Sequence, residues 1–258
     1  MIQERMKVLS QREIADGIYE LILEGSLAGK ITEPGQFVHI RIGEQLIFPL
    51  LRRPISICSV NPEYSRLTLI YRRTGVGTER LAKSRPGDRI DMLGPLGHGF
   101  PPESADDGMR ALIIGGGVGV PPLYGLSQVL SDRGVQVTHV LGFRSRKDIF
   151  YEDEFAALGE TVIVTEDGSN GRKGRVTDVL DQMDFDVAYA CGPLPMLKAV
   201  SDLITEKPLF LSLEQRMGCG VGACLACVMP AADKQDEKGY RRVCCDGPVF
   251  KAGEVKLC

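Results

Sequence analysis

The sequence predicts a multidomain α+β protein: an N-terminal antiparallel β-barrel, an α/β domain with a doubly wound parallel sheet, and a small C-terminal cysteine module. Three observations predict this fold class. Residues 1–100 contain short β-rich runs separated by turn residues, and residues 101–210 alternate apolar strands with amphipathic helical stretches. Residues 211–258 hold most of the eight cysteines. We therefore expect three units, with boundaries near residues 100 and 210.

The composition allows a sizeable core and excludes one class of partner. The chain has 258 residues, of which 43% are hydrophobic and 25% charged. The formal net charge is -3, and no cluster of Lys or Arg stands out, so we expect no nucleic-acid binding. Residues 1–17 carry charges throughout and lack the apolar segment of a signal peptide. We therefore expect a cytoplasmic protein.

One uncharged stretch, residues 111–131, is long enough to suggest a membrane span. Glycines and the pair Pro121-Pro122 interrupt it, whereas a spanning helix needs about 20 predominantly apolar residues. The stretch is better explained as a buried strand, a glycine loop and a helix. We expect no membrane span.

In the first unit, turn signals separate the expected strands. These signals are Glu33-Pro34-Gly35, Asn61-Pro62 and Pro86-Gly87-Asp88. Strands are expected at 37–42, 54–60 and 66–72. Short strands at this spacing are typical of an antiparallel barrel or sandwich.

The second unit follows a polar, Pro-rich linker at 101–109. Its alternation of strands and helices favours a parallel sheet with right-handed crossovers. Strands are expected at 111–116, 136–143, 161–167 and 186–192. The third unit carries a charged insert at 233–242.

The spacing of four cysteines in the third unit indicates an iron–sulfur site. Cys219, Cys224 and Cys227 form a C-x4-C-x2-C run, and Cys244 follows after sixteen residues. This is the pattern of plant-type [2Fe–2S] ligation, so one-electron transfer is the expected chemistry. A zinc site with four cysteine ligands and a disulfide framework are the alternatives, and Cys245 could replace Cys244 as the fourth ligand.

A glycine-rich loop after the first strand of the α/β unit is a candidate pyrophosphate site. A following helix N-terminus would add free N–H donors and its dipole. A plain tight turn is the alternative explanation. Cys191, after the strand at 186–192, is a candidate neighbour of a nicotinamide, or else a buried structural cysteine. The glycines are Gly115, Gly116, Gly117 and Gly119.

The turn after the second α/β strand bears on the choice between NAD and NADP. Arg144, Arg146 and Lys147 suit a 2′-phosphate, whereas Asp148 suits a free 2′-hydroxyl. A solvated charged turn explains the same residues equally well. The residues alone therefore leave this choice open.

The β-rich unit offers a candidate flavin site. Arg53 can bind phosphate bidentately, Pro54 fixes the local backbone, and Ser56 can hydrogen-bond the edge of a flavin ring. Gly77 and Thr78 precede a helical stretch and form a second candidate phosphate cradle. The alternative is that such arginines are surface residues with buried stems.

Several motifs together resemble the ferredoxin-NADP reductase superfamily with an appended [2Fe–2S] module. They are RPIS at 53–56, GVGT at 75–78, GPLGHGF at 94–100, GGGVGVPPL at 115–123 and CGPLPML at 191–197. Within that superfamily, EQRMGCGVGACLAC at 214–227 and VCCDGPVF at 243–250 resemble the dihydroorotate dehydrogenase B (NAD+) electron transfer subunits. The resemblance covers nearly the whole chain.

The resemblance implies cofactors and the residues that hold them. The glycine loop and the CGPLPML turn would bind NAD. Cys219, Cys224, Cys227 and Cys244 would ligate the cluster, and the position of Cys244 before DGPVF favours it over Cys245. FAD would be held by Arg53, Pro54, Ile55, Ser56, Ile70, Tyr71, Arg72, Gly77 and Thr78.

The resemblance also implies a relay between two subunits in pyrimidine biosynthesis. An FMN-containing catalytic subunit would oxidise dihydroorotate, and electrons would pass singly through the [2Fe–2S] cluster to FAD and then as a hydride to NAD. Two subunits of each kind would form a heterotetramer. A flavin iron–sulfur reductase subunit for a different partner, using NAD(P)H or ferredoxin, is the alternative function. A zinc-stabilised binding module on a barrel is another, and Cys58, Cys245 and Cys258 have no expected role.

Overall fold

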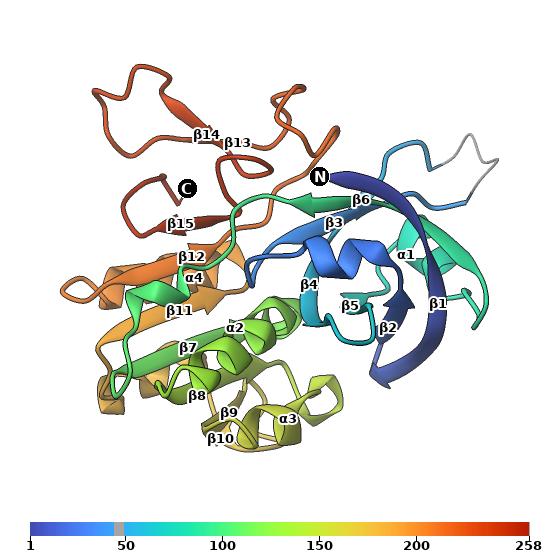
Figure 1. Ribbon diagram of the computed structural model, residues 1–258. Coiled ribbons are helices and arrows are strands. Elements are labelled where there is room, and N and C mark those ends of the chain that lie inside the picture. Colours follow the sequence, from blue (N-terminus) through green and yellow to red (C-terminus); the bar gives the residue numbers. More distant parts are fainter. Residues whose placement is uncertain (44–48, 258) are drawn as a thin grey trace.

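The computed structural model describes residues 1–43 and 49–257 and shows a barrel, a sheet flanked by helices, and a small cysteine-rich lobe (Figure 1). Six antiparallel strands close the barrel in the order β1-β2-β5-β4-β3-β6. One helix, α1 (Val76–Leu81), lies between the last two strands in sequence. The strands are β1 (Ile2–Ala15), β2 (Ile18–Glu24), β3 (Phe37–Ile40), β4 (Arg53–Asn61), β5 (Arg66–Arg72) and β6 (Arg89–Leu96).

The barrel forms because its strands alternate buried and accessible residues. In β6 every second residue is buried, and β2 buries Ile18, Leu21 and Leu23. Leu21 and Leu23 pack with Met6 and Met92 in the core of the barrel, whereas Ile18 packs toward the α/β unit. The strand expected at 66–72 is confirmed, whereas the strand expected at 37–42 ends at Ile40.

The α/β unit is a sheet in the order β10-β9-β8-β7-β11-β12-β15, in which only β15 is antiparallel to its neighbour. The expected strand, glycine loop and helix at 111–131 are confirmed. No helix within 1–43 or 49–257 is long and apolar enough to cross a membrane. The elements are β7 (Arg110–Gly116), α2 (Val120–Asp132), β8 (Gln136–Phe143), α3 (Glu152–Ala156), β9 (Glu160–Thr165), β10 (Arg172–Lys173), β11 (Val187–Cys191), α4 (Leu194–Leu203) and β12 (Leu209–Ser212).

The cysteine-rich lobe is joined to the sheet at both ends. It contains a hairpin of β13 (Val228–Pro230) and β14 (Tyr240–Arg242), and its last strand, β15 (Val249–Lys251), pairs with β12. The expected boundary at residue 210 falls inside β12. The lobe is therefore an excursion between two neighbouring strands of one sheet.

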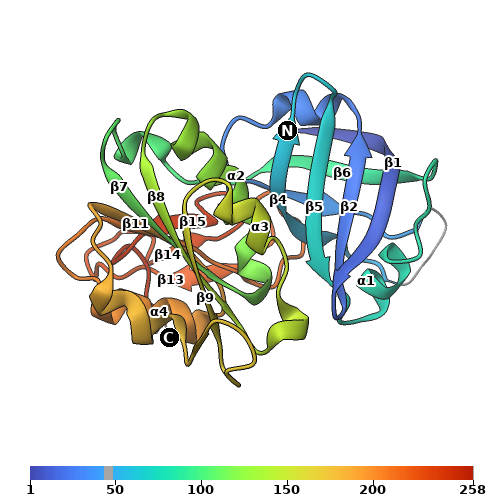
Figure 2. The ribbon, with the colours of Figure 1, turned by 90° about the horizontal axis from the view of Figure 1, so that it is seen from below.

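The barrel and the α/β unit meet across a tight helix–strand contact (Figure 2). Helix α2 crosses β4, where a Cβ on Gly125 would lie 2.8 Å from the carbonyl oxygen of Cys58. Ile18, Cys58 and Ile70 of the barrel share one buried cluster with α2. The 3₁₀ turn Gly117–Gly119 contacts β5, so the glycine loop lies against the barrel.

Candidate functional site

The four predicted ligand cysteines lie in two segments of the cysteine-rich lobe. Cys219, Cys224 and Cys227 occupy the irregular loop between β12 and β13, and Cys244 follows β14. Backbone N–H groups point at their sulfurs: Val221 N lies 3.4 Å from Cys219 Sγ. Such N–H groups stabilise negative charge on sulfur.

The sulfur contacts divide the four cysteines into two pairs. Cys219 N lies 3.4 Å from Cys224 Sγ, and Cys244 N lies 3.4 Å from Cys227 Sγ. Among the described residues, no three or more His, Cys, Asp or Glu side chains are grouped to hold a single metal ion. Two pairs of thiols suit a cluster of two irons, each of which takes two protein sulfurs. The donor set therefore fits a [2Fe–2S] cluster.

Burial and backbone N–H donors change the pKa of Cys219 in opposite directions. Burial raises the pKa of Cys219, but the N–H groups of Val221 and Cys224 outweigh it and lower the pKa to about 7. The loop is therefore built to hold a thiolate at this position.

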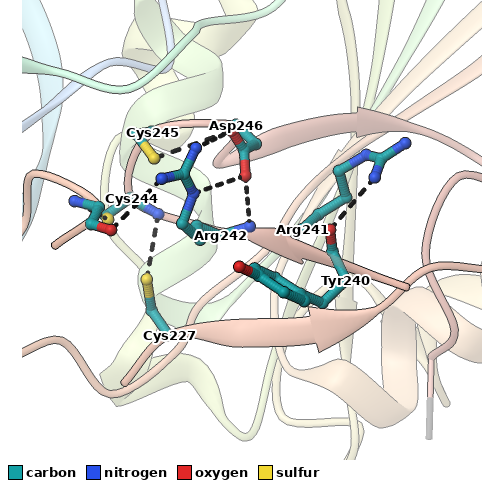
Figure 3. Close-up of polar contacts among 8 residues, drawn as sticks. Cys227, Tyr240, Arg241, Arg242, Cys244, Cys245 and Asp246 are labelled. Atoms are coloured by element: carbon teal, nitrogen blue, oxygen red, sulfur yellow. Dashed lines mark hydrogen bonds and ion pairs between the residues drawn. The ribbon is translucent and has the colours of Figure 1, made fainter. Parts of the chain in front are cut away.

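Cys244 and Cys245 have different surroundings. Cys244 is 1% exposed, and its sulfur accepts a hydrogen bond from Gly222 N at 3.1 Å. Cys245 is partly accessible, and its sulfur faces Asp246 Oδ1 at 3.8 Å (Figure 3). The geometry thus supports Cys244 as the fourth ligand, as the family resemblance implies.

The cysteine loop packs directly onto the barrel at His39. Gly220 has φ +73°, and a Cβ at this position would lie 2.5 Å from His39 Nδ1. The imidazole is fully buried, and neither ring nitrogen has a hydrogen-bond partner among the described residues. Burial is the main cause that lowers the pKa of His39, and the charges of Arg52 and Arg53 lower it further. A neutral imidazole therefore separates the loop from the barrel interior.

His39 also connects the cysteine loop to the predicted flavin segment. In the β3–β4 ladder, His39 is paired with Pro54, and Phe37 is paired with Ser56. His39 does not stand out as a functional residue from the sequence motifs. The one sequence feature that could have indicated it is its position inside the apolar run FVHI, because the ring nitrogens of a buried histidine normally have hydrogen-bond partners.

The predicted flavin residues gather at one edge of the barrel. Residues 53–56 begin β4, residues 70–72 end β5, and α1 begins beside them. A Cβ on Gly77 would lie 2.8 Å from Arg53 Nε, so the missing side chain makes room for the guanidinium. Thr78 Oγ1 accepts a hydrogen bond from Thr74 N at 2.9 Å, which fixes the start of α1. An arginine held over a glycine turn fits a phosphate group of FAD.

Tyr71 is turned away from that edge. Its ring stacks on Tyr19 with centroids 5.9 Å apart, and its hydroxyl contacts Gln11 inside the barrel. The side chain is 2% exposed. Of the predicted flavin residues, Tyr71 therefore offers its backbone rather than its ring.

The glycine loop and Cys191 are brought together by the sheet. The β7–β11 ladder pairs Gly115 with Cys191, and a Cβ on Gly119 would lie 2.3 Å from the carbonyl oxygen of Cys191. A Cβ on Gly116 would likewise lie 2.5 Å from the sulfur of Met196. These glycines are needed for the close packing of two loops. Burial raises the pKa of Cys191 to about 12, so this residue carries a neutral thiol.

The start of α2 offers fewer N–H donors than a pyrophosphate site at a helix N-terminus would have. Pro121 and Pro122 lie in its first turn and have no N–H groups. Free donors must therefore come from the loop itself rather than from the helix. Gly117, with φ +53°, is the loop residue whose conformation favours glycine.

The charged turn after β8 is only partly free for a ligand. Asp148 is buried and accepts a hydrogen bond from Ser145 Oγ at 2.7 Å, and Lys147 pairs with Asp16 of the barrel at 3.2 Å. Arg144 and Arg146 are exposed. The turn does not decide between NAD and NADP.

Two remaining cysteines and one glutamate lie outside the predicted cofactor sites or at their edge. Cys58 is buried against α2, which raises its pKa, and Cys258 lies outside the described residues. Glu214, which no sequence motif marks as functional, follows β12 at the sheet edge that holds Cys191. Glu214 is exposed, and its charge adds to burial in raising the pKa of Cys191.

Comparison with known proteins gives matches to two families and to close relatives. Residues 113–202 match the oxidoreductase NAD-binding domain, and residues 214–256 match the iron–sulfur cluster binding domain of dihydroorotate dehydrogenase B. Electron transfer subunits of dihydroorotate dehydrogenase B (NAD(+)) are similar over their full length. The one from Geobacillus thermodenitrificans (strain NG80-2) is 56% identical over 257 residues, covering 99% of both chains. The one from Bacillus cereus (strain G9842) is 54% identical over 259 residues, covering all of both.

Solved structures share the fold. The NADH-dependent reduced ferredoxin-NADP oxidoreductase superposes with a TM-score of 0.85 at 29% identity, covering 98% of this chain and 90% of the other. A ferredoxin NADP+ reductase from Neisseria gonorrhoeae with bound FAD and NADP superposes with a TM-score of 0.64 at 18% identity, covering 78% and 92%. The second likeness shows the fold alone.

The fold and the sites define a component of an oxidoreductase that uses FAD, a [2Fe–2S] cluster and NAD. The expected fold class is confirmed, and the iron–sulfur prediction is favoured over zinc. The chain belongs to the family of dihydroorotate dehydrogenase B (NAD(+)) electron transfer subunits. Membership in this family implies a catalytic partner subunit.

Proposed function

We propose that this chain passes electrons from an FMN-containing catalytic subunit, which oxidises dihydroorotate in pyrimidine biosynthesis, to NAD+. The two subunits form a 2+2 heterotetramer in the cytoplasm. When bound, the [2Fe–2S] cluster supplies one-electron chemistry, and FAD supplies the exchange between one-electron and hydride transfer. The chain itself needs no dihydroorotate site.

One observation carries this proposal. The cysteine loop packs on His39, and His39 is the ladder partner of Pro54 in the predicted flavin segment. The cross-strand pair of His39 and Pro54 therefore connects the two proposed cofactor sites. A buried, neutral imidazole excludes water there and fixes the loop relative to the barrel.

The roles proposed for individual residues follow from these contacts. The four cysteines Cys219, Cys224, Cys227 and Cys244 hold the cluster. Arg53 and the Gly77-Thr78 turn hold phosphate groups of FAD, while the backbone of 54–56 and 70–72 lines its ring. The glycine loop binds the pyrophosphate of NAD+, and the neutral thiol of Cys191 borders the nicotinamide. Because Cys191 does not ionise near neutral pH, it would shape the site without contributing charge.

The proposed domains keep the expected division, with the FAD-binding barrel at 1–100, the NAD-binding unit at 101–210 and the cluster module at 211–258. The position of β15 supports treating the last two as a single folding unit, because it completes the sheet of the NAD-binding unit.

The test is reconstitution of the complex. The chain is produced with the candidate catalytic subunit, and the purified complex is examined for flavin and iron–sulfur absorbance. Dihydroorotate-dependent reduction of NAD+ and NADP+ is then measured with and without this chain. We expect both cofactors and a requirement for this chain with NAD+. Cofactors without such a requirement would contradict the assignment to dihydroorotate oxidation.

A second candidate function has one observation in its favour. The likeness to the NADH-dependent reduced ferredoxin-NADP oxidoreductase covers nearly the whole chain at a TM-score of 0.85. A reductase subunit for another partner would keep the same fold and cofactors. Reduced ferredoxin offered to the chain in place of dihydroorotate would distinguish the two, because only the second candidate predicts rapid NAD(P)+ reduction from it.

A further inference from the structure

Arg242, the last residue of β14, joins two segments of the cysteine module through its guanidinium. Nε and Nη2 bind the two carboxylate oxygens of Asp246 at 3.0 and 2.9 Å. Nη1 donates to the carbonyl oxygen of Gly222 at 3.3 Å, on the loop that carries the first three cysteines. The guanidinium thus binds the carboxylate of Asp246 and, with its remaining nitrogen, the backbone of the cysteine loop.

The backbone of the same residue closes the turn that carries Cys244. Arg242 N donates to Asp246 Oδ2 at 2.8 Å, and Arg242 O accepts from Cys245 N at 3.2 Å and Asp246 N at 2.8 Å. Cys244 lies inside this turn. The ion pair and the turn therefore hold the fourth cysteine in place together.

Gly222 places the guanidinium close to the sulfur of Cys244. Its N–H donates to Cys244 Sγ at 3.1 Å, while its carbonyl accepts from Arg242. A Cβ on Gly222 would lie 3.0 Å from Arg242 Nη1 and 2.6 Å from Cys245 Sγ, and φ is +80°. One glycine therefore separates a fixed positive charge from a cluster ligand.

The pair is partly withdrawn from water, which strengthens its field. The side chains of Arg242 and Asp246 are 29% and 25% exposed. Charges in this setting are screened less than at an open surface. The reduction potential of an iron–sulfur cluster depends on nearby charge and on hydrogen bonds to its sulfurs.

We propose that Arg242 and Asp246 are positioning residues that set the reduction potential of the [2Fe–2S] cluster. The guanidinium favours the cluster with the added electron, and the carboxylate opposes it. This inference rests on the proposed cluster site. It predicts that loss of the two charges shifts the potential in opposite directions, which a purely structural role does not.

The neighbouring pair provides a matched control. Arg241 binds Asp236 at 2.5 Å and donates to its neighbour's carbonyl oxygen, Tyr240 O, at 3.1 Å. Its side chain is 33% exposed, close to that of Arg242. Figure 3 shows the guanidinium of Arg241 away from the cysteines. The variant R241Q therefore removes an equivalent ion pair without touching the loop.

The experiment uses the full chain purified with its catalytic subunit. Redox titration, monitored by the electron paramagnetic resonance signal of the reduced cluster, gives the midpoint potential of R242Q, D246N, R242K and R241Q. Flavin content and cluster content are measured on the same samples. A wild-type complex without a cluster signal would overturn the proposed function itself, before any variant is compared.

With a wild-type signal present, we expect R242Q to lower the potential and D246N to raise it. Each shift should change the ratio of reduced to oxidised cluster by about tenfold at fixed ambient potential, 59 mV for a one-electron couple. R242K should stay nearer to wild type than R242Q, and R241Q should match wild type. If R242Q does not retain its cluster, D246N and R242K decide the test. Shifts of the same sign, no shift in D246N, or an equal shift in R241Q would overturn the proposal.

Discussion

Gly220 in the cysteine loop lies against the imidazole of His39 so closely that a Cβ on the glycine would come within 2.5 Å of Nδ1. The contact joins the loop that carries three predicted cluster ligands to a barrel strand. His39 cannot move away easily, because it is fully buried. The position of the loop therefore depends on a glycine.

The variant G220A should lose the cluster. The new methyl group would force the loop off the barrel, in addition to the cost of about 1–2 kcal/mol for an L-residue at positive φ. Cluster absorbance per chain is the measurement. G239A is the control, since Gly239 has φ +67° but nothing within 4 Å of its Cβ position. Equal cluster content in the two variants would refute the role of the His39 contact.

C244S should abolish the iron–sulfur signal, whereas C245S should retain it. Only Cys244 accepts the Gly222 N–H bond and lies among the other sulfurs. Iron and sulfide content per chain, measured after anaerobic purification, checks this. Loss of the cluster in C245S alone would reverse the assignment of the fourth ligand.

G77A should weaken FAD binding by at least tenfold while the chain stays folded. The methyl group would displace the guanidinium of Arg53, whose Nε lies 2.8 Å from the Cβ position. The dissociation constant for FAD, measured by fluorescence on the deflavinated chain, reports this. G75A is the matched variant, because Gly75 is extended and has nothing within 4 Å. If both variants bind FAD as the wild type does, Arg53 does not hold the cofactor.

A buried histidine should make the α/β unit sensitive to acid. His139 contacts Ser127 Oγ at 2.6 Å and Thr161 Oγ1 at 3.0 Å, and burial lowers its pKa from 6.5 to about 4. Because the folded state binds the proton less tightly, the free energy of unfolding should fall as pH decreases from 6.5 to about 4. The loss is on the order of 3 kcal/mol and is complete below the folded pKa.

Urea unfolding at pH 7 and pH 5 tests this dependence. The variant H139Q should lose less stability than the wild type over that interval, because a glutamine does not titrate. All other groups contribute equally to both proteins, so the difference isolates His139. Parallel losses would show that other groups cause the acid sensitivity.

Much of the fold could be predicted from local sequence. The strand at 66–72 is rich in apolar and β-branched residues, and the run 111–131 combines an apolar strand with glycines and prolines. Barrel closure could not be derived, because a barrel and a sandwich share the same strand pattern. Closure depends on the pairing of β1 with β6, which are distant in sequence.

The site could be predicted only where the spacing of residues along the sequence indicates the chemistry. The four cysteines are such a case. His39 and Arg242 were missed, because their importance comes from contacts with Gly220 and Gly222 that no local pattern encodes. Pro121 and Pro122 of α2 lack N–H groups, which lowers the number of donors at the expected phosphate site.

The pairing of β15 with β12 has a consequence for how the chain assembles. The edge of the central sheet is completed only by residues that follow the cysteine loop in the sequence. The cysteine loop must therefore be synthesised before β15 can pair with β12. Deleting the cysteine-rich lobe together with β15 would remove an edge strand of the sheet. We expect insertion of the cluster and completion of the NAD-binding sheet to occur in the same folding step.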